Sequence, residues 1–160
     1  MKNLVKHWGP VVLWITVIAI ESTSDLSAAN TGPILWRVLS ACFGHLDPSR
    51  FDLLHLALRK VGHFTGYAVL CLLIFRGLRA SFQHAALSVC SALAVWVTFL
   101  VACADEWHQS FLPSRTGLFR DVLLDTAGAI AAQAVVLIAA SRRARTSGLD
   151  PSVVSRKFAK

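Results

Sequence analysis

The sequence predicts an all-α polytopic membrane protein, a four-transmembrane-helix bundle with an outer amphipathic, interfacial loop helix. Of its 160 residues 55% are hydrophobic, which is enough for four spans of roughly 20 residues each. Only 16% of the residues are charged, whereas about 25% is usual in soluble domains. The apolar residues also gather into separate runs with the charged residues between them. Intrinsic disorder is therefore excluded, and an isolated soluble core is not expected.

We place the four spans at about 8–24, 59–76, 82–104 and 121–140. Lys2 and Lys6 precede the first span, and residues 27–29 behind it resemble a signal-peptidase site. The polar residues 21–25 separate that site from the apolar run, so we expect the first span to be retained. The second span is interrupted by polar residues. The last two are long enough to cross about 30 Å of hydrocarbon.

A long loop joins the first two spans. Residues 34–43 of this loop are apolar but too short to cross the bilayer, so we expect them in or on the outer interface. Asp47 followed by Pro48 is typical of a helix N-cap and first turn. Apolar residues then recur at helical spacing over residues 51–58, which predicts a helix that runs on into the second span.

The distribution of Lys and Arg predicts that both termini lie in the cytoplasm. With the N-terminus inside, ten of the 16 basic residues lie on the inner side. These are Lys2, Lys6, Arg76, Arg79, Arg142, Arg143, Arg145, Arg156, Lys157 and Lys160. Residues 141–160 form a basic cytoplasmic tail in this arrangement. Nucleic-acid binding is not expected, because no aromatic residues interleave with the basic ones in the manner that stacks bases.

Polar residues recur on one side of the second span. Arg59, His63 and Tyr67 follow one another at intervals of four, and Gly62 and Gly66 form a G-x-x-x-G on nearly the same side. Glycines at that interval favour close approach of another helix. We therefore expect the imidazole to point into the bundle. The alternative is a packing histidine that donates to a neighbouring carbonyl group.

The third span ends in acidic and amide residues. Asp105, His108 and Gln109 lie within one turn on one face, and Glu106 lies about 100° away. A charged group at bilayer depth costs about 2.5 to 3.5 kcal/mol, and less toward the interface. These carboxylates therefore require polar or cationic partners.

The fourth span begins with two further acids, Asp121 and Asp125, on one face. Arg115 and Lys60 belong to a basic set on the same predicted side and can neutralise them. Glu21, at the outer end of the first span, joins the same layer. All four spans thus contribute to one predicted outward-facing polar pocket.

Two strings in these segments resemble a known family. R-K-V-G-H-F-T-G-Y at residues 59–67 and D-E-W-H-Q-S-F-L-P-S-R-T-G-L-F-R-D-V-L-L-D-T-A-G at residues 105–128 are similar to the paired signatures of the VanZ-like family of small bacterial integral membrane proteins. That family has K-x-x-H-F-x-x-Y, then D-E-x-x-Q-x-F-x-P-x-R ahead of D-x-x-x-N-x-x-G. The resemblance covers nearly the whole chain. It departs at Arg59, where the family often has Asp, and at Asp125, where it often has Asn.

The resemblance implies a location in the bacterial inner (cytoplasmic) membrane and a role in the cell envelope. The family takes its name from a protein that lowers susceptibility to teicoplanin, a glycopeptide with a lipid tail that acts at the outer leaflet. We expect the pocket to bind a membrane lipid, a lipid-linked envelope precursor or a lipidated glycopeptide. The expected ligand-binding residues are Glu21, Lys60, His63, Tyr67, Asp105, Glu106, His108, Gln109, Arg115, Asp121 and Asp125.

Other interpretations of the same residues stay open. The chain could be an intramembrane hydrolase or transferase acting on a lipid-linked substrate, with Asp105 or Glu106 as general base, His63 or His108 as its partner, and Arg115 stabilising charge. These acids and histidines could also ligate a metal, but the spacing signal is weak, so we expect no metal and no cofactor. The cluster could instead only fix helix packing. Transport would require an oligomer, because the inner halves of the last two spans carry few polar residues.

Overall fold

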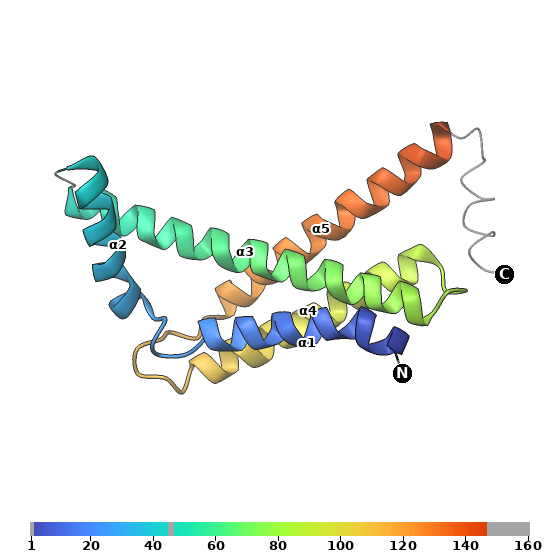
Figure 1. The fold of residues 1–160 in the computed structure, drawn as a ribbon, viewed down its shortest axis with the longest axis horizontal. Helices are drawn as coiled ribbons and strands as arrows, with labels where there is room; N and C mark the ends of the chain where they lie inside the picture. The colour runs from blue at the N-terminus through green and yellow to red at the C-terminus, as the bar shows by residue number, and fades with distance from the viewer. Residues whose placement is uncertain (1, 45–46, 147–160) are drawn as a thin grey trace.

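The computed structural model describes residues 2–44 and 47–146, and this part of the chain is all-helical (Figure 1). Its helices are α1 (Lys2–Glu21), α2 (Ala28–Phe43), α3 (Pro48–Ser81), α4 (Leu87–Gln109) and α5 (Phe119–Thr146). Helices α3, α4 and α5 are long and apolar enough to cross a membrane. The all-helical membrane class is therefore confirmed. The fourth span, expected in the 20-residue α1, stays a prediction.

Large apolar side chains cover the outside of these helices. Val12 on α1, Trp96 on α4 and Val135 on α5 are more than half exposed, at 65%, 58% and 68%. The interior between the helices is instead filled with small and medium side chains such as Cys71 and Ala94. An apolar exterior around a closely packed interior is the arrangement that a lipid solvent favours.

Helix α3 is the central element, because it contacts each of the other four helices. It begins where the sequence predicts: the Asp47 carboxylate accepts a hydrogen bond from the backbone N–H of Arg50 at 3.0 Å, and Pro48 occupies the first turn. The helix then continues for 34 residues. The expectation that the loop helix runs on into the second span is thus confirmed.

Helices α3 and α5 cross near the middle of the molecule (Figure 1), and Gly128 lies at the crossing. A Cβ atom added to Gly128 would lie 2.2 Å from the carbonyl oxygen of Phe64, so a larger residue would push the helices apart. The predicted close approach of another helix over Gly62 and Gly66 is wrong. Apart from the adjoining backbone of α3 itself, no atom of the described residues lies within 4 Å of a Cβ added at either position.

Helices α1 and α2 both pack on α3. The indole N–H of Trp14 on α1 donates to the carbonyl oxygen of Gly66 at 2.8 Å. Helix α2 starts earlier than the expected residues 34–43, and it lies beside the N-terminal part of α3 (Figure 1). The rings of Trp36 and Phe51 meet edge to face there, with centroids 4.9 Å apart. The position of α2 at an outer interface stays a prediction.

The predicted basic tail begins as a continuation of a helix. Residues 141–146 are the last part of α5, and residues 147–160 lie outside the described residues. Helices α3, α4 and α5 also share a buried polar contact. The Ser91 hydroxyl donates to Gln133 Oε1 at 2.7 Å, and Gln133 Nε2 donates to Cys71 Sγ at 3.4 Å, which satisfies a buried amide without a charge.

The crossing predicts opposite effects of alanine at two glycines. Gly128→Ala should lower the Tm of the purified protein in detergent by several degrees, because the added methyl group meets the α3 backbone. Gly62→Ala should leave the Tm unchanged or raise it, because alanine favours helix over glycine by about 1 kcal/mol. Equal Tm values for the two variants would contradict the assigned crossing.

Candidate functional site

The carboxylate of Asp105 is the centre of a buried hydrogen-bonded network, defined here as the Asp105 network. The hydroxyl of Ser22 donates to Asp105 Oδ1. Asp105 Oδ2 accepts from the Tyr67 hydroxyl at 3.0 Å and from Gln109 Nε2 at 2.9 Å. Three donors from the end of α1, from α3 and from α4 thus compensate the buried charge. This network joins three helices.

Arg115 anchors the end of α1 from the loop between α4 and α5. Its Nε and Nη2 groups donate to the carbonyl oxygen of Thr23 at 3.2 and 2.8 Å, and Nη2 also donates to that of Glu21. A helix leaves its last carbonyl groups without partners, so a guanidinium there stabilises the helix end. Burial lowers the pKa of Arg115, and the charge of Arg59 lowers it further. An arginine side chain nevertheless stays protonated in proteins.

The loop after α4 folds back over the helix end, and Gly117 makes this possible. A Cβ at Gly117 would lie 2.3 Å from the carbonyl oxygen of Glu106. The return path brings the backbone N–H of Leu118 to Glu106 Oε2 at 2.9 Å. The loop therefore fixes the orientation of the Glu106 carboxylate, which is 5% exposed.

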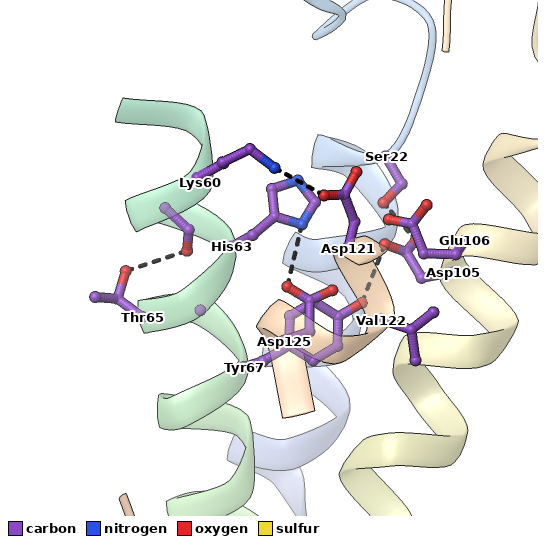
Figure 2. Close-up of polar contacts among 12 residues, drawn as sticks. Ser22, Lys60, His63, Thr65, Tyr67, Asp105, Glu106, Asp121, Val122 and Asp125 are labelled. Atoms are coloured by element: carbon purple, nitrogen blue, oxygen red, sulfur yellow. Dashed lines mark hydrogen bonds and ion pairs between the residues drawn. The ribbon is translucent and has the colours of Figure 1, made fainter. Parts of the chain in front are cut away.

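His63, Glu106 and Asp125 meet where α3, α4 and α5 converge, and we call them the His–carboxylate cluster (Figure 2). The distance from His63 Nδ1 to Asp125 Oδ1 is 3.5 Å, which is an ion-pair contact but longer than a good hydrogen bond. One ligand atom from each of the three residues lies within 4.8 Å of the other two. Gly128 is one turn after Asp125 and contacts Phe64, the residue after His63, so the helix crossing sets this contact.

A pocket of about 360 Å³ opens beside the cluster. At its edge, Lys60 Nζ contacts Asp121 Oδ1 at 3.0 Å (Figure 2). Polar and charged lining residues come from several elements. They are Asp52, His55, Arg59, Lys60, His63, Glu106, Gln109, Ser114, Arg115, Thr116 and Asp121. The pocket therefore combines cationic side chains with the histidine and one carboxylate of the cluster.

The structure brings most of the predicted site residues together, but it separates two of them. His108 is exposed, although it was expected on the face of Asp105 and Gln109, which are both buried. The Glu21 side chain is also exposed, and only its carbonyl oxygen reaches Arg115. Tyr67 and Asp105 belong to the Asp105 network and do not line the pocket, whereas the remaining predicted residues line the pocket or form the cluster.

Sequence reasoning missed three contributors. Ser22 donates to Asp105, and its place beside Glu21 at the end of the first span was the available signal. Asp52 and His55 line the pocket from the first turns of α3. Both residues lie on one face of the helix that begins after the predicted N-cap. No motif in the sequence links them to the pocket residues that follow more than 50 positions later.

The exposed apolar helices and the polar pocket define a helical membrane protein with a pocket lined by charged side chains. The chain belongs to the VanZ/LLP1 family, because the model of that family matches residues 8–140. The predicted family resemblance is therefore confirmed. No curated protein matches the chain, and no solved structure matches it.

The Asp105 network predicts the cost of removing a single hydroxyl group. Tyr67→Phe should destabilise the protein by about 1.5 to 3 kcal/mol, because it removes one hydrogen bond to a buried charge. The measurement is thermal unfolding in detergent. Thr65→Val is the matched control, since the Thr65 hydroxyl is exposed and donates only to its own helix. Equal destabilisation by the two changes would refute the role of the network.

Proposed function

We propose that the pocket binds the phosphate-bearing head group of a lipid-linked cell-envelope precursor, or a lipidated glycopeptide of the teicoplanin type. In this proposal the chain lies in the bacterial inner membrane with four spans and both termini in the cytoplasm, so that the pocket faces the outer leaflet. The excess of Lys and Arg on the opposite side of the spans supports that orientation.

The observation that carries the proposal is the set of cations around the pocket. Arg59, Lys60 and Arg115 all line it, and such side chains bind phosphate oxygens well. Lys60 is 48% exposed and its contact with Asp121 contributes no more than about 1 kcal/mol. Its ammonium group can therefore turn toward a phosphate at little cost.

A second cavity supports an amphiphilic ligand. It has a volume of about 600 Å³ and lies between α4 and α5. Seven of its eleven lining residues are apolar, among them Val95, Trp96, Phe99, Ile130 and Leu137, and the other four are Ser88, Ser91, Thr126 and Gln133. A surface of this kind suits a hydrocarbon chain, while the charged pocket suits a head group.

Binding is tested by native mass spectrometry of the purified protein with a polyprenyl diphosphate and, for comparison, a zwitterionic phospholipid. The Arg59→Ala/Lys60→Ala double variant should bind the diphosphate at least about tenfold more weakly, because a hydrogen bond to a charged group contributes about 1.5 kcal/mol or more. The zwitterionic lipid should bind weakly to both proteins.

The matched control is the Arg37→Ala/Arg120→Ala double variant. It removes the same charge from two exposed residues that do not line the pocket. This variant should bind the diphosphate as the unmodified protein does. If both double variants lose the same affinity, general attraction between charges accounts for binding and the pocket assignment fails.

Hydrolysis or group transfer on such a lipid is a second candidate function, and the contact between His63 and Asp125 favours it. A histidine held by a buried carboxylate is suited to general acid–base catalysis. In hydrolysis of a diphosphate, His63 or Glu106 would take the proton of a water molecule as its oxygen bonds to phosphorus and the bond to the leaving phosphate breaks. Asp105 is engaged in its network, which favours Glu106 over Asp105 as the base.

This candidate predicts phosphate release by the purified protein from a polyprenyl diphosphate, measured with and without divalent ions. His63→Ala should reduce the rate by about 10² to 10⁴-fold, the usual contribution of an acid–base group. His55→Ala, a second pocket histidine that contacts Thr31, should retain most of the rate. If the unmodified protein releases no phosphate, hydrolysis of this substrate is excluded and the binding proposal is unaffected.

A further inference from the structure

We propose that His63, Glu106 and Asp125 form a binding site for one divalent transition-metal ion, of the Zn²⁺ or Mn²⁺ class. This inference goes beyond the proposed function, since an ion binds or fails to bind in the absence of any lipid. It also differs from the metal set considered from sequence, in which Asp105 and His108 took the place of Asp125. The structure engages Asp105 in hydrogen bonds and leaves His108 exposed.

The three side chains of the cluster are grouped closely enough to converge on one ion. One imidazole nitrogen and one oxygen from each carboxylate lie within 4.8 Å of one another. In a tetrahedral site with metal–ligand bonds of about 2.1 Å, the ligand atoms are about 3.4 Å apart. Side-chain movements of about 1 Å would therefore bring all three residues into coordination.

The second and independent observation is the state of Asp125. Its side chain is fully buried, yet within residues 2–44 and 47–146 neither carboxylate oxygen has a hydrogen-bond partner. His63 Nδ1, which faces Asp125, also lacks one. Buried carboxylates are normally hydrogen-bonded or bound to a metal. An ion between these atoms would supply the missing interaction.

The charges around the cluster also favour a bound cation. The three cationic side chains that line the pocket have other partners. Arg59 donates to the carbonyl oxygen of Leu26, Arg115 donates to those of Glu21 and Thr23, and Lys60 contacts Asp121. A divalent ion would interact with both carboxylates of the cluster, and a ligating His63 would be neutral.

The surroundings also orient the ligands. The backbone N–H of Leu118 donates to Glu106 Oε2 and so fixes the orientation of this carboxylate, as outer hydrogen bonds commonly do at metal sites. A mixed set of one imidazole and two carboxylates suits Zn²⁺ or Mn²⁺ better than a soft ion such as Cu⁺. His63 and Glu106 line the pocket, so the remaining coordination positions would face it. A phosphate oxygen could occupy them, a consequence that rests on the proposed function.

The test measures metal content without any lipid. The full chain, with any affinity tag removed, is stripped with a chelator, incubated with Zn²⁺ or Mn²⁺, desalted and analysed by elemental mass spectrometry. We expect about one ion per chain and a higher Tm than that of the stripped protein, because binding to the folded state stabilises it. Asp125→Asn and His63→Ala should each retain less than a fifth of the metal.

Two control variants keep the chemistry and change the position. Asp25→Asn removes an exposed carboxylate that does not line the pocket, and His108→Ala removes an exposed histidine close to Glu106 in the sequence. Both should bind metal as the unmodified protein does. Metal loss in Asp25→Asn equal to that in Asp125→Asn would overturn the assignment.

A measurement on the unmodified protein covers the case in which the cluster variants do not fold. Co²⁺ added to the stripped protein should give visible absorption bands of a nitrogen and oxygen site, and one equivalent of Zn²⁺ should abolish them. If the unmodified protein takes up no ion and shows no Co²⁺ bands, the metal site is refuted. That result would leave the binding of a phosphate lipid by Arg59 and Lys60 untouched.

Discussion

The contact between α3 and α5 at Gly128 is the constraint on which the site depends. The absence of a side chain there lets the backbone of Phe64 lie against α5. That approach places His63 beside Asp125, one turn from the crossing. With a larger residue at the crossing the two helices would separate and the cluster would open, so a steric property of one residue controls the chemistry of its neighbours.

The Asp105 network and the His–carboxylate cluster lie side by side, and they have different roles. In the Asp105 network every donor has an acceptor, and the donors come from three helices. Such a network fixes how helices pack. In the His–carboxylate cluster both carboxylate oxygens of Asp125 lack hydrogen-bond partners among the described residues. Unsatisfied polar groups in a buried position are costly for stability, and this cost is more readily explained by a ligand than by packing.

The departures from the family pattern have separate structural settings. Arg59 reaches across to the carbonyl oxygen of Leu26, in the segment between α1 and α2. Asp125 faces His63. Within the described part of the chain, Arg59 is therefore accommodated by a carbonyl group, whereas Asp125 has the contact with the imidazole at 3.5 Å and no hydrogen bond to its carboxylate.

Hydrophobic runs determined the all-helical membrane class, because helices of that length and apolarity are stable in lipid. The sequence also determined the start of α3, through the local hydrogen bond of Asp47, and the family, through its two polar strings. Tertiary structure alone decided which polar residues meet. Helical periodicity places a residue on a face but does not fix how two helices are rotated about their axes. It therefore could not show that His108 points away, that Ser22 joins Asp105, or that Gly128 rather than Gly62 and Gly66 forms the crossing.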